Sequence, residues 1–109
     1  MIFISKKRLK KLPESGFLEV APELVVEIFS PSETWKEIED KIDEYFAAGV
    51  KWIWVVNTKN RDLIIYQGDK EPKKLRENDT LIGEDILSGF ELKISKFFAI
   101  LKNLHLLFN

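Results

Sequence analysis

Two charged residues, Glu27 and Lys41, occupy positions where their side chains could do chemistry. Glu27 interrupts an apolar run over residues 24–29, and burying an ionised carboxylate without partners costs several kcal/mol. The chain must therefore supply a counter-charge or a metal ion, raise the pKa of this carboxyl group, or let it reach solvent at the end of a strand. Taken by itself, an exposed glutamate paired with a lysine is the simpler interpretation.

Lys41 lies at the margin of the apolar face of a predicted helix, beside Tyr45. A long side chain at such a margin can extend along the helix toward the end of the strand that carries Glu27. The alternative is an intrahelical ion pair with Glu37, four residues earlier, and for Lys41 alone that is the simpler reading. Glu23 shares a strand face with Glu27 but lies on the order of 13 Å away, too far to share one metal ion directly. We therefore interpret Glu23 as a residue at the start of the strand.

A basic segment near the N-terminus offers a different chemistry, the binding of phosphates with release of counterions. It contains Lys6, Lys7, Arg8, Lys10 and Lys11. The ordinary alternative for such a segment is a solvated loop face. The single histidine, His105, belongs to an apolar C-terminal stretch, where we expect it at the margin of the core and not as a ligand.

The composition excludes several kinds of site. The 109 residues include no cysteine, so thiolate metal centres and cysteine nucleophiles are ruled out, and the isolated glycines form neither a P-loop nor a dinucleotide-binding motif. Carboxylates, lysines and hydroxyls must carry any chemistry. Hydrophobic residues at 45% and charged residues at 32% indicate one ordinary globular domain over residues 1–109. The sequence shows no signal-peptide pattern and no stretch that could span a bilayer, so we expect a cytoplasmic protein that does not associate with membranes.

These candidate residues are positioned by a predicted strand–helix–strand unit. The run over 24–29 predicts a strand buried on both faces, which Ser30 and Pro31 terminate. Apolar residues recur at helical spacing over 34–48, where Ser32 or Thr34 can cap the start and Gly49 suits the end. Residues 52–56 predict a second central strand, and a strand, a helix and a strand in this order favour a right-handed parallel unit.

The rest of the chain predicts a mixed sheet. Residues 2–4 form a short strand, residues 63–66 an antiparallel strand after a turn, and residues 73–75 an edge strand. Residues 79–90 are rich in loop signals, a short strand follows at 91–94, and Ser95 caps a final apolar helix. The predicted fold class is α/β.

Three blocks of the sequence resemble a known family. Residues 21–32, Ala-Pro-Glu-Leu-Val-Val-Glu-Ile-Phe-Ser-Pro-Ser, resemble the signature of the Uma-type family of restriction endonucleases, part of the PD-(D/E)XK nuclease superfamily. Residues 41–56 are similar to the next block, a lysine, a tyrosine, Gly-Val and an aromatic-rich strand, and residues 79–83 and 87–90 to the closing segment. The resemblance covers nearly the whole chain. It implies a restriction-endonuclease-like mixed β-sheet core with one crossover helix and a C-terminal helix, as a partial fold.

The resemblance also implies a chemistry. In this family an aspartate and a glutamate on adjacent strands hold a divalent ion, usually Mg²⁺, for hydrolysis of DNA phosphodiesters, and a lysine assists. Glu27 matches the glutamate and would be a catalytic residue and a metal ligand, and Lys41 matches the catalytic lysine. Phe29 stands where the superfamily often has a lysine, which this family places on the helix.

One departure from the family pattern predicts reduced activity. The family's Pro-Asp pair would fall immediately before Met1, so the chain resembles an N-terminally truncated member with one metal-binding carboxylate in place of two. We therefore expect an impaired Mg²⁺-dependent DNA endonuclease domain. The alternative is a catalytically silent module that binds DNA or forms homo-oligomers. A third reading is a start codon that lies further upstream.

Overall fold

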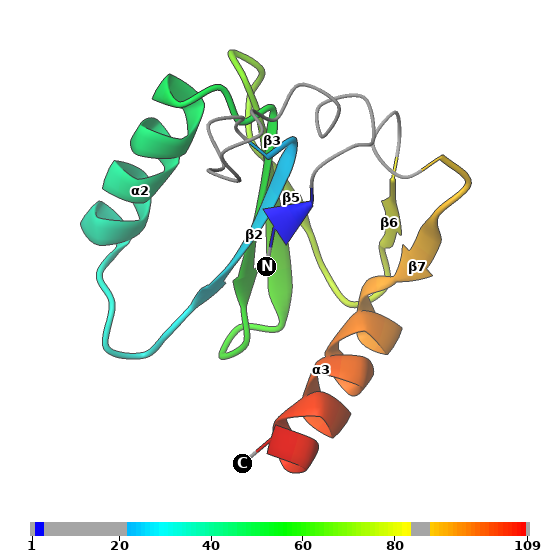
Figure 1. The fold of residues 1–109 in the computed structure, drawn as a ribbon. Coiled ribbons are helices and arrows are strands. Elements are labelled where there is room, and N and C mark those ends of the chain that lie inside the picture. The colour runs from blue at the N-terminus through cyan, green and yellow to red at the C-terminus, as the bar shows by residue number, and fades with distance from the viewer. Residues whose placement is uncertain (1, 4–21, 84–87, 109) are drawn as a thin grey trace, which may run out of the picture.

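A five-stranded mixed sheet forms the centre of the computed structural model, which describes residues 2–3, 22–83 and 88–108 (Figure 1). Its strands, in spatial order, are β1 (Ile2–Phe3), β2 (Leu24–Phe29), β3 (Trp52–Asn57), β4 (Asp62–Gln67) and β5 (Lys73–Leu75). Strands β2 and β3 are parallel and the other neighbouring pairs are antiparallel. The predicted α/β class and the parallel pairing across the crossover helix are confirmed.

Helix α2 (Trp35–Ala47) connects β2 to β3 and packs on one face of the sheet. Thr34 caps it, since its Oγ1 accepts the backbone N–H of Glu37 at 3.2 Å. Gly49 follows the helix with φ of 101°, the left-handed conformation that glycine adopts without a Cβ clash. The helix buries Ile38 and Ile42 against the sheet.

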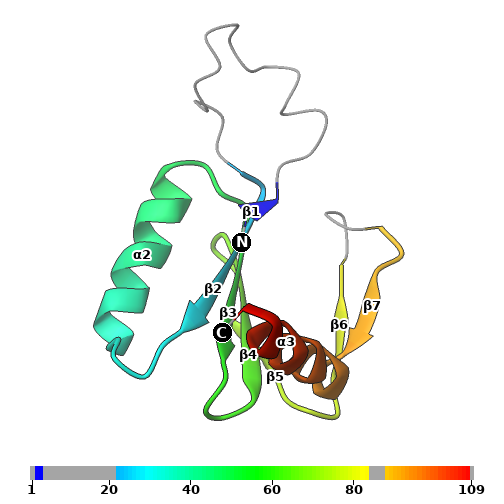
Figure 2. The same ribbon diagram turned by 60° about the horizontal axis from the view of Figure 1, so that its bottom comes forward.

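Helix α3 (Ile94–Phe108) and a separate two-stranded sheet cover the other face (Figure 2). The small sheet pairs β6 (Thr80–Ile82) with β7 (Glu91–Lys93). Strand β6 lies in the segment predicted to be loop-rich; it is only three residues long and pairs outside the main sheet, which is why no clear alternation marks it. Ser95 is not the helix cap, because α3 already begins at Ile94, whose N–H donates to the Asp79 carbonyl at 2.9 Å.

Strand β2 is buried in its first half only, which corrects the expectation that it is buried on both faces. Its residues Leu24–Val26 are buried, Glu27 is intermediate, and Ile28 is 49% exposed. Strand β1 pairs with Leu24 and Val25, and no other described strand lies on that side of β2. The second half of β2 therefore forms an edge of the sheet, and Glu27 lies on it. None of the described helices is long and apolar enough to span a membrane.

Candidate functional site

Glu27 projects from β2 to the side of the sheet that carries α2. The Tyr45 hydroxyl, from the last part of that helix, donates a hydrogen bond to Oε1 of Glu27. The bond to this carboxylate, together with burial, raises the pKa of the Tyr45 phenol to about 12. The Glu27 side chain keeps 20% exposure, so its carboxylate is oriented by the protein but still open to solvent.

Lys41 reaches the same carboxylate from the middle of α2. Its Nζ lies 3.9 Å from Oε2 of Glu27, so the two oxygens of Glu27 face two different groups of the helix. The described ion pairs of Lys41 are with Glu27 and Glu33, and the alternative pairing with Glu37 is not formed. The structure thus brings the two predicted site residues together, while their catalytic roles stay predictions.

Glu33, which the sequence analysis did not single out, completes the cluster. Its Oε2 accepts a hydrogen bond from Lys41 Nζ at 2.9 Å, and its Oε1 accepts the backbone N–H of Ser30 at 3.1 Å. These two bonds hold the pKa of the Glu33 carboxyl below its ordinary value, and the bond to Glu33 raises the pKa of Lys41. No periodic pattern marks Glu33, because its contacts run across the bend between strand and helix.

Two aromatic rings close this bend. Phe29 at the end of β2 stacks on Trp35 at the start of α2, with ring centroids 4.8 Å apart and an angle of 24° between planes. Inside the bend, the hydroxyls of Ser30 and Ser32 lie 3.0 Å apart and share a hydrogen bond. The stack thus joins the end of β2 to the start of α2 across the bend that contains Glu33.

The cluster combines two carboxylates, one ammonium group and one phenol, and carries a formal net charge of −1. Carboxylate oxygens are ligands that suit Mg²⁺, so the donor chemistry of Glu27 fits such an ion. The number of donors does not: within residues 22–83 and 88–103, no group of three His, Cys, Asp or Glu residues is arranged to hold a metal. The described carboxylates of the cluster therefore do not form a metal site by themselves.

The other predicted residues lie apart from this cluster. Glu23 acts at the start of β2, where its carbonyl oxygen accepts the backbone N–H groups of Lys51 and Trp52 at 3.2 and 2.9 Å. The basic segment of Lys6, Lys7, Arg8, Lys10 and Lys11 lies outside the described residues, and so does the side chain of His105. Their roles stay predictions.

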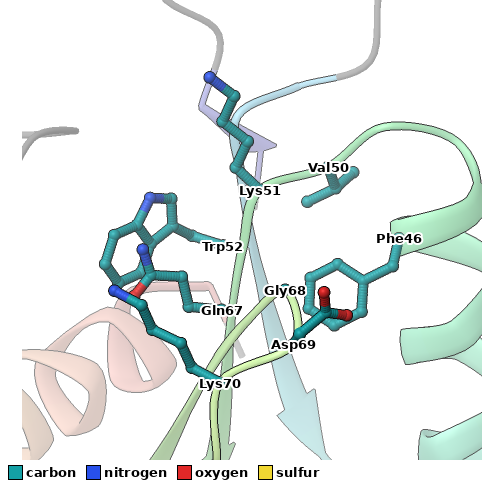
Figure 3. Close-up of a pocket in the computed structure, with 8 residues that line it drawn as sticks. All are labelled: Phe46, Val50, Lys51, Trp52, Gln67, Gly68, Asp69 and Lys70. Carbon is teal, nitrogen blue, oxygen red and sulfur yellow. The ribbon is translucent and has the colours of Figure 1, made fainter.

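A hollow of ≈ 730 Å³ lies where β3 begins and the hairpin after β4 turns (Figure 3). Figure 3 shows the Lys51 side chain directed away from the other lining residues. Asp69 is the one carboxylate of this lining. None of the described ion pairs joins Asp69 to a lysine of this lining, so we do not assign the candidate chemistry to the hollow.

Comparison with known proteins agrees with this fold. No curated protein matches the sequence. A crystal structure described as a "putative nuclease belonging to DUF820" from Anabaena variabilis ATCC 29413 is similar, with a TM-score of 0.74 and 20% sequence identity. The similarity covers 88% of this chain and 56% of that one, so this chain spans little more than half of its length. The restriction-endonuclease-like fold expected from the sequence is thereby confirmed.

A family model, Uma2, described as "Putative restriction endonuclease", matches residues 1–95. This range contains all four residues of the cluster, including the strand that carries Glu27 and the helix that carries Lys41. The resemblance inferred from the three sequence blocks is confirmed, and the chain belongs to the Uma2 family.

Proposed function

We propose that this chain contributes the glutamate and the lysine of a magnesium-dependent site that hydrolyses DNA phosphodiesters. The observation that carries the proposal is the 3.9 Å contact between Lys41 Nζ and Glu27 Oε2 at the exposed end of β2. Membership of a family described as restriction endonucleases supports the class of reaction. Magnesium would polarise a phosphate oxygen and the attacking water when bound beside Glu27.

The charge of each side chain in the cluster would suit it to a different role. Glu27 would offer one oxygen to the metal ion, while the Tyr45 hydroxyl holds the other oxygen and so fixes the plane of the carboxylate. Lys41 would place its ammonium group against the negative charge that develops on the phosphate, as cationic clamps do in phosphoryl transfer. Glu27 already contacts both Tyr45 and Lys41, as these roles require.

The pairing of β1 with β2 indicates where a second carboxylate would have to lie. Ile2 is opposite Val25 and Phe3 is opposite Leu24 in this antiparallel pair. Continued in the same register, the position immediately before Met1 would face Glu27. Directly opposite residues on one face have Cβ atoms roughly 4.5–5.5 Å apart, a spacing that allows two carboxylates to share one ion. An aspartate at that position is what the family pattern contains.

The decisive experiment compares plasmid DNA cleavage by three proteins. They are the chain itself, the chain with an added N-terminal segment ending in aspartate directly before Met1, and a matched control in which that aspartate is asparagine. We expect cleavage with Mg²⁺ only for the aspartate form, and we expect EDTA, Glu27→Gln and Lys41→Met each to abolish it. Equal cleavage by all three proteins that disappears in Glu27→Gln would show that the described residues already complete the site.

A second candidate function, a silent assembly module, is favoured by exposed apolar surface. Ile28 lies at the free edge of β2 beside a hollow of ≈ 430 Å³ that Phe98 and Leu101 help to line. Such a surface favours self-association. Sedimentation velocity distinguishes the readings: Ile28→Ser should dissociate an oligomer held by this edge, whereas Ile100→Ser, which changes an equally exposed isoleucine on α3, should not. A monomer at all concentrations would eliminate the assembly reading.

DNA binding without cleavage is the other form of this second candidate. The basic segment would then hold the phosphate backbone, with an affinity that falls steeply as salt rises. Fluorescence anisotropy with a labelled duplex at two salt concentrations tests it. Replacing Lys6, Lys7, Arg8, Lys10 and Lys11 by glutamine should remove the binding. Retention of the same affinity in that variant would exclude the segment as the binding surface.

A further inference from the structure

Glu33 is a carboxylate whose direction is set by the backbone. It lies in the bend between β2 and α2, where its own N–H donates to the Ser30 carbonyl at 3.1 Å. Its Oε1 accepts the Ser30 N–H, also at 3.1 Å, so main chain and side chain of Glu33 both bind the same residue. Its side chain is only 17% exposed. Glu33 therefore presents Oε2 from a fixed position near the end of β2.

Among the described ion pairs of Lys41, the shorter one is with this oxygen, Oε2 of Glu33. The distance from Lys41 Nζ to Glu33 Oε2 is 2.9 Å, against 3.9 Å to Glu27 Oε2. The Lys41 side chain is 43% exposed and rises from the margin of a helix, where a lysine without a partner samples many rotamers. One ammonium group that lies between two carboxylates has its direction restricted, provided that at least one carboxylate is itself held in place.

We propose that Glu33 is a positioning residue for Lys41, which it holds by the ammonium group so that the lysine stands beside Glu27. The proposal rests on the proposed function in so far as a positioned ammonium group matters for a phosphate at Glu27. The difference between the two distances from Lys41 Nζ has a chemical consequence. Because Glu33 makes the closer contact, Lys41 is directed to the site while Oε2 of Glu27 keeps room for another cation.

Glu37 provides a matched control for this role. It is also a glutamate near Lys41, one helical turn before it, and its negative charge also favours the charged form of Lys41. It is exposed and makes no described ion pair with Lys41, so it shares the charge of Glu33 but not the contact. Glu33→Gln and Glu37→Gln each remove one charge near Lys41, and only the first replaces an ion pair with Lys41 by a contact to a neutral amide.

The first measurement uses the chain as it is and does not depend on catalysis. The order parameter of the Lys41 ammonium group, from ¹⁵N relaxation of lysine NH₃⁺ signals at low temperature, reports how firmly the group is held. We expect it to fall in Glu33→Gln and to stay unchanged in Glu37→Gln. Glu33→Asp should give an intermediate value, since the shorter side chain cannot span Ser30 and Lys41 at full length. An unchanged order parameter in Glu33→Gln would overturn the proposal.

The second measurement links position to reaction, in the form of the protein that carries the added aspartate before Met1. We expect Glu33→Gln to lower kcat by about 10- to 100-fold, the cost of a misplaced catalytic group, with KM little changed. Partial recovery in Glu33→Asp would support the positioning role, and full activity in Glu33→Gln would overturn it. If the order parameter falls in Glu33→Gln alone but no variant cleaves DNA, the contact stands and the proposed nuclease function fails.

Discussion

Among the ion pairs of the described residues, two lysine–carboxylate pairs of nearly equal length lie in different surroundings. Lys41 Nζ lies 3.9 Å from Glu27, and Lys74 Nζ lies 4.0 Å from Asp62. The Asp62 side chain is the more buried of the two carboxylates, at 10% exposure against 20% for Glu27. By distance and burial alone, the pair at Asp62 would be as good a candidate for chemistry as the pair at Glu27.

The difference lies in the other partners of each carboxylate. Both oxygens of Glu27 face a donor, Tyr45 or Lys41, and the lysine has a second carboxylate in Glu33. Oδ1 of Asp62 is buried and accepts no hydrogen bond from the described residues. A single ion pair without further partners therefore does not define a site. A site is defined by the groups that orient each oxygen of the carboxylate.

The largest effect should come from a substitution in helix α2, which carries Lys41 of the first pair and neither residue of the second. Ile38→Ala removes a fully buried side chain that holds α2 on the sheet, at a cost of about 2–5 kcal/mol in the free energy of unfolding. Urea denaturation measures this cost. Ile38→Val, at about 0.5–1.5 kcal/mol, serves if the alanine variant does not fold. If Ile38→Ala changes the NMR chemical shifts of Lys74 as much as those of Lys41, the two ion pairs are not independent.

The second prediction concerns the pair at Asp62. Lys74→Met leaves a buried carboxylate without its described cation and should cost about 1–3 kcal/mol. Asp62→Asn, which removes the charge itself, should change the free energy of unfolding by less than about 1 kcal/mol. Chemical denaturation at neutral pH compares the two. The reverse order, with Asp62→Asn the more damaging, would mean that Asp62 has a strong partner after all.

The third prediction concerns the hydrogen bond that distinguishes Glu27. Tyr45→Phe should cost about 1–2 kcal/mol, since it removes a donor to a charged acceptor. In a double-mutant cycle with Glu27→Gln, the two losses should be less than additive, which identifies a shared interaction. Strictly additive losses would show that the phenol and the carboxylate act separately. The corresponding cycle of Tyr45→Phe with Asp62→Asn should be additive.

The fourth prediction is a spectroscopic one. The phenol of Tyr45 should ionise near its pKa of about 12, above the ordinary value of 10.0, because its proton is held by Glu27. Tyr45 therefore contributes stability that is fully present below pH 10.0 and is lost as the pH rises through about 12. Absorbance at ~295 nm follows tyrosinate. Burial also raises the pKa of Tyr66, the second of the two tyrosines, so the measurement needs the Tyr66→Phe background. In Glu27→Gln the transition should move down toward the ordinary value.

The fifth and smallest effect is expected in acid. The bonds from Lys41 and Ser30 lower the pKa of Glu33 from its ordinary value of 4.5. Glu33 thus contributes stability that is present above pH 4.5 and is lost as the pH falls through its depressed pKa. Unfolding free energies measured between neutral and acidic pH should fall more gently in Glu33→Gln than in the parent chain. Equal slopes in the two proteins would contradict this expectation.

Much of this arrangement could be predicted from the sequence because it follows strong periodic signals. The bounds of β2, the helix of α2 and the parallel partner β3 come from apolar runs and helical spacing, and the family blocks identify Glu27 and Lys41. Strand β6 is too short to alternate, and Ser95 is a favoured cap residue that here lies inside the helix. Glu33 and Tyr45 could not be assigned partners, because their contacts depend on how the bend after β2 turns.

The stacked pair Phe29–Trp35 also gives the protein an optical probe of its own site. Of the three tryptophans, Trp52 and Trp54 are buried in the core, whereas Trp35 is 42% exposed at the bend that also holds Glu33. Emission that acrylamide quenches at low concentration should therefore come chiefly from Trp35. A cation or a nucleic acid that reorganises the bend would change this component and leave the core emission constant, so occupancy could be followed without a label.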